Sequence, residues 1–241
     1  MKLLSVFETL ATLTSSGENA SFPASNIKLL DPMLRWHADA YTGAVWLMVD
    51  FGAAKSLTGF FLNQANFPAC VISGDDTPSP WSPAFTMNCS LLRDDLNNRK
   101  GFFSSSTFNY RYLRVTIAGS QSLDNSETVP SLGNLIVGAS ETLPFVTDLN
   151  PAIVTKKKSF DCPGGGYFEA DIGRGRQVIT MGLGDTWAKF RSMSKSWADA
   201  VVFADLGNVA ESWLVFSPGN WEKPIKNIFD SKMSFQLRER T

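Results

Sequence analysis

The stretch VWLMVDFGAAKSLTGFFLNQANF, residues Val45 to Phe67, decides the fold that this sequence predicts. It holds two apolar runs, Trp46–Asp50 and Leu57–Leu62, with a glycine between them. Short apolar runs on either side of a glycine are typical of consecutive β-strands. Because the first run is apolar at almost every position, we expect it to be covered on both faces or to end against a second sheet.

A polar tail follows the second run, where Asn63, Gln64 and Asn66 precede Phe67 and Pro68. Asparagine side chains satisfy free backbone groups in turns, which favours a corner of a β-sandwich. The alternative that stays open is a loop that contacts a ligand.

The composition is that of a globular β-protein. The chain has 241 residues, of which 44% are hydrophobic and 19% charged, and 18 glycines and 12 prolines separate its short apolar runs. The net charge of −1 gives no sign of binding to nucleic acid or to an anionic membrane. The lysines at 156–158 are interpreted as a solvated loop.

Further strands are predicted along the first 140 residues. In YRYLRVTI (110–117) the bulky residues alternate with Arg111 and Arg114, which we place on the outer face. The other predicted strands of this part are Cys70–Ser73, Ala84–Leu92, Tyr112–Ala118 and Leu132–Val137.

A composition shift, with two prolines in ASETLPFVTDLNP (139–151), predicts a linker over residues 141–152. Residues 153–241 are predicted to form a second β domain. One helix is predicted in this domain, over about residues 186–200, because its apolar residues recur at helical spacing: Trp187, Phe190, Met193 and Trp197. The glycines at 164–166 and 173–175 lack the spacing of a phosphate-binding loop and predict tight hairpin turns. The predicted strands are Ile153–Thr155, Tyr167–Ile172, Gln177–Met181, Val201–Ala204, Trp213–Phe216 and Met233–Arg238.

The three cysteines, Cys70, Cys89 and Cys162, are too widely spaced for a metal pair or a disulfide framework. We expect buried, reduced thiols in a chain made in the cytoplasm. Glu8 interrupts the apolar N-terminal stretch, so no signal peptide is predicted. No apolar stretch approaches the ~18 residues of a transmembrane helix.

Five segments in this order resemble the discoidin family, also called coagulation-factor C-type domains. They are LRWHA (34–38) ahead of WLMVDFG (46–52), then SLTGFFL (56–62), YRYLRVTI (110–117) and SLGNLIVGA (131–139). The resemblance covers about residues 20–140, within a domain of residues 1–140. It implies a mainly β fold, the galactose-binding-like jelly-roll sandwich. The structural calcium of many relatives is not expected, because Pro32 stands where they have glycine.

A narrower resemblance is to discoidin-like domains in virion proteins of tailed bacteriophages, through FFLNQANF (60–67). The second domain, which ends KMSFQLRERT (232–241), loosely resembles phage distal tail and tail tube proteins. These resemblances imply a smaller β-sandwich or barrel with one α-helix after the jelly roll.

Catalytic chemistry has little support in this sequence. His37 is the only histidine, so a site with two histidines is excluded, and no nucleophile-elbow motif is present. No cofactor or metal is predicted, and the chain is predicted not to be an enzyme.

The sharpest ligand hypothesis is a carbohydrate site. Trp81, held between prolines in TPSPWSP (77–83), could offer its ring to the C–H face of a sugar. Polar contacts would come from four further residues: Asn63, Asn66, His37 and Arg35. The alternative is that Trp81 packs on the sandwich or on another subunit.

The leading functional prediction is a structural virion component of a phage tail tip or baseplate, assembled in the bacterial cytoplasm. Its partners would be other tail or baseplate proteins and copies of itself in a ring, and 7 Trp and 18 Phe are compatible with large buried interfaces. Neither nucleic acid binding nor membrane insertion is expected. Two alternatives remain: a carbohydrate-binding module for a host-surface glycan, and a hydrolase with an accessory jelly roll.

Overall fold

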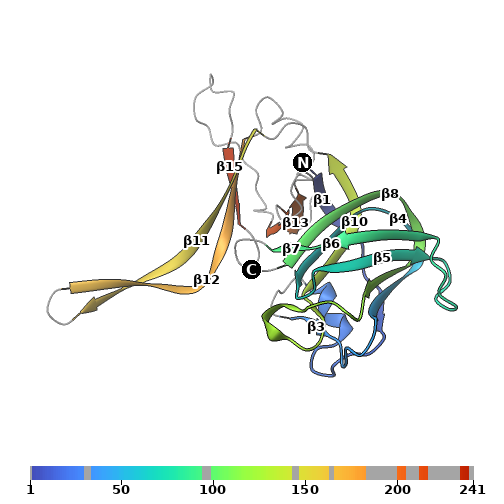
Figure 1. Ribbon diagram of the computed structural model, residues 1–241. Coiled ribbons are helices and arrows are strands. Elements are labelled where there is room, and N and C mark those ends of the chain that lie inside the picture. The colour runs from blue at the N-terminus through green and yellow to red at the C-terminus, as the bar shows by residue number, and fades with distance from the viewer. Residues whose placement is uncertain are drawn as a thin grey trace, which may run out of the picture. The chain divides into compact units, whose positions relative to one another are not determined.

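The computed structural model describes residues 2–29, 34–93, 99–142, 147–162, 166–182, 200–204, 212–216 and 234–238 (Figure 1). These residues are mainly β-strand, with two short 3-10 helices, η1 (Ala24–Lys28) and η2 (Asp124–Ser126). The chain divides into two compact units. The first comprises Met1–Thr142 and Val202–Ser212, and the second comprises Leu143–Val201 and Trp213–Thr241.

Two long strands, β4 (Val45–Ala65) and β8 (Arg99–Ile117), form the centre of the first unit. They are antiparallel neighbours along almost their whole length, from the pair Val45 and Ile117 to the pair Ala65 and Arg99. The register shifts between Asp50 and Lys55 and again near Gly59 and Ala65. Such shifts bend a strand pair, and here they divide each long strand into two segments.

The bend folds one continuous sheet into two layers. The first layer runs β2 (Thr12–Ser15), the segment 45–50 of β4, the segment 112–117 of β8, β5 (Ala69–Asp75) and β6 (Phe85–Ser90). The second layer runs β1 (Lys2–Phe7), β10 (Asn134–Thr142), the segment 59–65 of β4, the segment 99–104 of β8 and β7 (Leu92–Arg93).

An ion pair lies at the bend. Arg111 donates two hydrogen bonds of 2.8 Å to Asp50, whose Oδ1 also accepts a hydrogen bond of 2.7 Å from the Gly52 amide. The hydrogen bond from Arg111 is the main reason that the pKa of Asp50 is lowered to about 2. Gly52 has a φ of 78°, a conformation that glycine adopts without steric cost.

The core lies between the two layers. Leu47, Val49 and Val115 of the first layer and Phe60 and Leu62 of the second are all fully buried in one hydrophobic cluster. A two-layer antiparallel sandwich with this strand order confirms the predicted mainly β, galactose-binding-like jelly roll.

One of the two alternatives predicted for the start of the deciding stretch is wrong. The segment Val45–Asp50 is not covered on both faces, because Trp46, Met48 and Asp50 are only half-buried and alternate with buried residues. Trp46 packs on the outer face against Arg114, so an apolar residue here does not mark the core. The segment that is buried almost throughout is Leu57–Ala65.

Two smaller elements complete the first unit. A two-stranded sheet of β3 (Trp36–His37) and β9 (Ser131–Leu132) lies near η1. Strand β13 (Ala200–Ala204) pairs through residues 202–204 with β1, on the side of β1 that β10 does not occupy. Residues 202–204 lie in the sequence between the two segments of the second unit, and the sequence pattern predicts them to be part of the second domain. Strand β14 (Ser212–Phe216) begins in the first unit and continues in the second.

The second unit contains a long antiparallel hairpin of β11 (Thr147–Cys162) and β12 (Gly166–Gly182). Strand β15 (Ser234–Arg238) pairs with residues 178–182 of β12. The first six residues of β11 belong to the stretch predicted as a linker. The predicted helix over 186–200 lies outside the described residues, apart from Ala200, which begins β13.

Two predictions about this hairpin are wrong. Residues 156–158 form part of β11 and not a loop, and they pair with residues 170–172 of β12. The glycines at 173–175 do not turn the chain; they lie inside β12, where the register shifts between Val154 and Lys156. The three residues 173–175 stand opposite Thr155 alone, which makes this a bulge.

We predict that Phe60→Ala lowers the free energy of unfolding by ~3–5 kcal/mol, because truncating a buried ring leaves a cavity. Phe60 is fully buried, and its ring centroid lies 5.5 Å from that of Phe108 and 6.5 Å from that of Phe85. Urea unfolding followed by tryptophan fluorescence measures the loss.

Leu92→Ala is the control, because Leu92 is 45% exposed and its truncation should cost less than ~0.5 kcal/mol. A loss below ~1 kcal/mol for Phe60→Ala would mean that the two layers do not pack around this ring.

Candidate functional site

The polar tail of the deciding stretch is buried. Asn63 and Gln64 are each 4% exposed, and Asn66 is 2% exposed. Asn66 accepts a hydrogen bond of 2.8 Å from the Ser131 amide and donates to the Val129 carbonyl at 2.8 Å and to Glu127 Oε2 at 2.5 Å. Both ends of its amide are therefore used by the segment 127–131, as a sandwich corner requires.

Asn63 is held in a similar way. Its Nδ2 donates to Asn134 Oδ1 at 3.2 Å, and Asn134 in turn donates to the Leu29 carbonyl at 2.6 Å. Gln64, next in the chain, has a φ of 56°, a left-handed conformation, and lies where the register of β4 with β8 shifts between Asn63 and Ala65. The hydrogen bonds of Asn63 and Asn66 thus join the end of β4 to two segments, 127–131 and the start of β10, and Asn134 of β10 is bonded in turn to Leu29.

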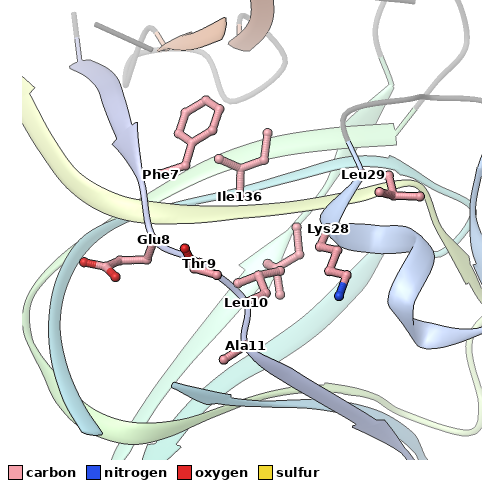
Figure 2. Close-up of a pocket in the computed structure, with 9 residues that line it drawn as sticks. Phe7, Glu8, Thr9, Leu10, Ala11, Lys28, Leu29 and Ile136 are labelled. Carbon is pink, nitrogen blue, oxygen red and sulfur yellow. The ribbon is translucent and has the colours of Figure 1, made fainter. Parts of the chain in front are cut away.

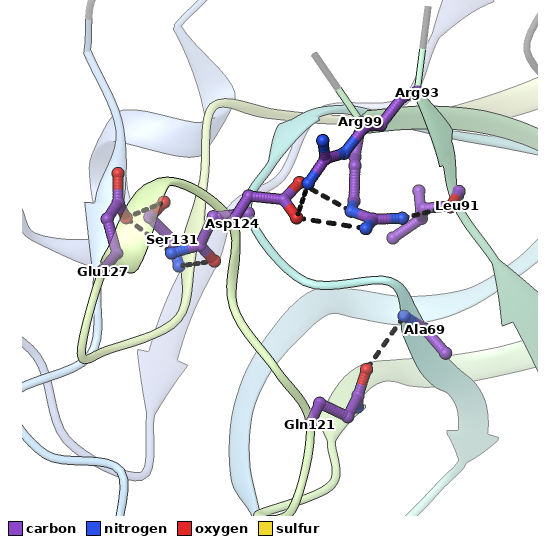
Figure 3. A network of polar contacts seen from close by, with 9 residues as sticks. Ala69, Leu91, Arg93, Arg99, Gln121, Asp124, Glu127 and Ser131 are labelled. Carbon is purple, nitrogen blue, oxygen red and sulfur yellow. Dashed lines mark hydrogen bonds and ion pairs between the residues drawn. The ribbon is translucent and has the colours of Figure 1, made fainter. Parts of the chain in front are cut away.

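An ionic cluster extends this corner (Figure 3). Asp124 accepts hydrogen bonds from Arg93 at 2.6 Å and from Arg99 at 2.6 and 3.0 Å, and its own amide donates to the Asn66 carbonyl at 2.7 Å. Burial alone would raise the pKa of Asp124, but the hydrogen bonds from Arg99 and Arg93 outweigh it and lower the pKa. The cluster fixes the irregular segment between β8 and β9.

His37 lies close to the same corner. In β3 it pairs with Ser131 of β9, and its ring stacks on Phe22 with centroids 4.3 Å apart. Burial lowers the pKa of His37. The charge of Glu127 acts to raise this pKa, and the charge of Arg35 acts to lower it further. The structure therefore brings His37 and Asn66 together through Ser131. Arg35 precedes β3, is half-buried, and accepts a hydrogen bond from Asn26 on its carbonyl at 2.9 Å.

Trp81 belongs to a different group of side chains. The guanidinium of Arg114 lies 5.4 Å from the Trp81 ring and 4.6 Å from the Trp46 ring, so the cation contacts both indoles. Burial lowers the pKa of Arg114, yet a guanidinium stays protonated in proteins. Its Nε is buried and has no hydrogen-bond partner. Each aromatic contact with a cation contributes ~0.5–1 kcal/mol at an exposed site.

The sheet register shows what surrounds this group. Trp46, Thr116, Val71 and Asn88 form one row across four strands, because each is the direct partner of the next. A second row contains Met48, Arg114, Ser73 and Thr86. Direct partners in an antiparallel sheet point to the same face, here the outer face of the first layer. We call Trp46, Trp81 and Arg114, with Thr86, Asn88 and Thr116, the tryptophan face.

The sequence analysis found Trp81 but missed Trp46 and Arg114 as its neighbours. The signal was present in the alternation. Since Val45, Leu47 and Val49 point inward, Trp46 must point outward, toward the same side as Arg114.

The loop that carries Trp81 is fixed by Asp75 at the end of β5. This carboxylate accepts hydrogen bonds from the Thr77 amide at 3.1 Å and from the Ser82 amide at 3.3 Å. The hydrogen bond from Thr77 is the main reason that the pKa of Asp75 is lowered. The loop conformation therefore holds Trp81 in place before any ligand binds.

A hollow of about 490 Å³ lies beside β1 and η1 (Figure 2). Its walls are mostly apolar, and its one carboxylate, on Glu8, forms an ion pair of 3.0 Å with Lys55. Across the described ranges, no group of three or more His, Cys, Asp or Glu side chains is placed to hold a metal ion. That the chain is not an enzyme stays a prediction.

No helix within the described part of the chain is both long and apolar enough to span a membrane.

Comparison with known proteins finds only distant similarities, all to solved structures. No protein-family model matches the chain, and no curated protein matches it. A solved structure of chitosan-binding module 1 from a chitosanase/glucanase of Paenibacillus sp. IK-5 is 19% identical, with a TM-score of 0.43 over 54% of this chain and 96% of that one. The lectin domain of lectinolysin, complexed with Lewis B antigen, is 11% identical, with a TM-score of 0.42 over 53% of this chain and 92% of that one.

A third similar structure is XRCC1 bound to the catalytic domain of DNA polymerase β. It is 8% identical, with a TM-score of 0.43 over 56% of this chain and 98% of that one. Similarities this distant carry no argument about what the present chain binds.

We predict that Asp124→Asn lowers the free energy of unfolding by ~2–3 kcal/mol at pH 7, because Arg99 loses the charge that offsets its burial. The folded-state pKa of Asp124 lies below its ordinary value. Its stabilisation is therefore present above about pH 4 and is lost as the pH falls through the folded-state pKa. Urea unfolding of the wild type and the variant from pH 7 to pH 3 should show the difference shrinking.

Glu8→Gln is the matched control, because the Glu8 and Lys55 side chains are 33% and 37% exposed. Exposed ion pairs contribute little, so this variant should lose less than ~1 kcal/mol. Equal losses for the two variants would show that the Asp124 cluster does not hold the corner.

Proposed function

We propose that this protein binds carbohydrate through the tryptophan face. The observation that carries the proposal is the stack of Trp46, Arg114 and Trp81 on the outer face of a sheet, with cation-to-ring distances of 4.6 and 5.4 Å. Both indoles are half-buried and so retain contact with solvent. Aromatic rings bind the C–H faces of sugars, while amide, hydroxyl and guanidinium groups bind the hydroxyls.

The stack also supports the proposal energetically. A ring that must be immobilised on binding loses conformational freedom, and that loss subtracts from affinity. Here the cation between the rings and the hydrogen bonds of Asp75 hold the indoles beforehand. The exposed Thr86 and Asn88 lie on the same face and offer groups that bind hydroxyls.

The charges around the tryptophan face favour a neutral sugar. Asp75 lies two residues along β5 from Ser73, the partner of Arg114, and the adjacent Asp76 accepts a hydrogen bond of 3.0 Å from the Arg111 amide. Asp75 thereby places a negative charge on the outer face that Arg114 occupies. An acidic sugar would gain less from Arg114 than it would at an isolated cation.

We predict that Trp81→Ala weakens binding of a neutral glycan at least about tenfold, corresponding to a loss of ~1.4 kcal/mol. A glycan array identifies the ligand, and calorimetric titration measures the Kd. The fold should persist, with the unfolding midpoint within a few degrees of the wild type, because Trp81 is not part of the core.

Phe22→Ala is the matched control, since Phe22 is an aromatic residue that is 40% exposed and stacks on His37 at the other group of candidates. Its Kd should equal that of the wild type. Loss of binding on Phe22→Ala or Arg35→Ala, with Trp81→Ala unaffected, would move the site to β3. Absence of binding to every glycan on the array would overturn the proposal.

A second candidate function is assembly in a phage tail tip or baseplate. The observation that favours it is the β11–β12 hairpin, whose strands have 16 and 17 residues. Among the described residues, β12 has a second partner only at 178–182, and β11 pairs with β12 alone. A long open strand edge can pair with a strand of another chain. The lysines at 156–158 oppose this in the middle of β11, because edge lysines hinder pairing.

If the assembly function holds, we expect the full chain to form a defined oligomer between ~1 and 100 µM, measured by light scattering and electron microscopy. Replacement of Ile153 by proline should then reduce the mass, since proline lacks the amide that a strand ladder needs. A strict monomer over the whole concentration range would contradict this function and leave the glycan proposal unchanged.

A further inference from the structure

Cys70 and Cys89 face each other across the β5–β6 hairpin. They are direct partners in the antiparallel register, and both are free and buried, at 4% and 1% exposure. Cys89 Sγ donates a hydrogen bond to the Met87 carbonyl at 3.6 Å. The two cysteines that lie far apart in the sequence are therefore in contact.

The backbone at this position suits a covalent bond. The amide of Leu91 donates to the carbonyl of Pro68 at 2.8 Å, and these residues continue the register of β5 and β6. Antiparallel pairs alternate in type, so Cys70 and Cys89, two positions further on, form a pair of the same type, with Cα atoms about 5.5 Å apart. Disulfides join Cα atoms about 4.4–6.8 Å apart and Cβ atoms about 3.5–4.5 Å apart. The Cα spacing therefore fits, and the Cβ atoms, about 5.5 Å apart in a hydrogen-bonded pair, must approach each other by about 1 Å, which a shift of the edge strand β6 allows.

We propose that Cys70 and Cys89 are an oxidation site that closes to a cross-strand disulfide in the presence of a small disulfide oxidant such as oxidised glutathione. One cysteine thiolate attacks a glutathione sulfur and releases one glutathione thiolate. The second cysteine thiolate attacks the mixed disulfide and releases the other. The two cysteines are oxidised, oxidised glutathione is reduced to two thiols, and the two cysteine protons pass to them.

The reaction of the folded protein is slow. The hydrogen bond to Cys89 and then burial raise the pKa of the Cys70 thiol well above its ordinary value, and only the thiolate attacks. Access comes from β6, which has β5 as its one ladder partner in the described part of the sheet and can open without disturbing the centre. During folding both thiols are exposed, and the same bond closes faster.

The disulfide would act on the loop that carries Trp81, since this loop connects β5 to β6. Closing a ring from residue 70 to residue 89 restrains the unfolded chain and ties an edge strand to its neighbour. The oxidised form should unfold at a temperature at least about 5 °C higher than the reduced form.

The test uses the full chain, both folded and during refolding from urea, in buffer with oxidised and reduced glutathione at pH 8. We expect the number of free thiols to fall from three to one and the intact mass to fall by about 2 Da, corresponding to the loss of two hydrogens. Peptide mapping without reductant should join the peptides of Cys70 and Cys89. A reductant should restore all three thiols and the lower unfolding temperature.

Cys162→Ser separates this pair from the third cysteine and should still lose 2 Da. Cys70→Ala, which keeps a small apolar group in the core, should lose neither mass nor thiols by internal closure. Three free thiols after refolding, or oxidation confined to Cys162, would overturn the proposal. A closed disulfide without a rise in the unfolding temperature would show that the bond does not stabilise the β5–β6 hairpin.

Discussion

The pairing of β4 with β8, which continues on both sides of the bend, is the constraint on which the first unit depends. Two strands of 21 and 19 residues remain partners while the sheet bends, so both layers of the sandwich share one central pair. The bend needs a glycine with positive φ and an arginine that satisfies the adjacent carboxylate. Successive side chains of a strand point to opposite faces of the sheet, so the position of the bend decides which side chains face the core. Phe60 is buried and Trp46 is half-buried for this reason.

The two candidate regions of the molecule use polar groups in opposite ways. At the corner formed by Asn63, Asn66 and Asp124, the amide and carboxylate groups bind segments of the same chain. On the tryptophan face, Arg114 has ring contacts and no ion-pair partner among the described residues. A surface group whose hydrogen-bonding capacity is not used internally is the better candidate for a ligand, because binding then breaks no existing contact.

The sequence predicted the fold more fully than the site. Apolar runs located the strands that meet the core, and the resemblance supplied their order. The first half of β8 was missed because FFSSSTF (102–108) mixes buried Phe102 and Phe108 with exposed serines, which resembles a loop. The grouping of Trp81 with Trp46 and Arg114 depends on a register that joins three distant segments. No local pattern encodes such a register. The alternation of apolar residues along the strand could nevertheless have shown that Trp46 points outward.

The return of the chain to β13 has a practical meaning for anyone who wishes to produce the sandwich alone. Strand β1 lies between β10, which ends at Thr142, and β13, which follows about sixty residues later. A recombinant fragment truncated after Thr142 would lack β13 and leave one side of β1 bare. Such a fragment would be prone to precipitation or self-association even though its core is complete. Restoring solubility would call for a short engineered linker that brings residues 200–204 back, in place of the intervening unit.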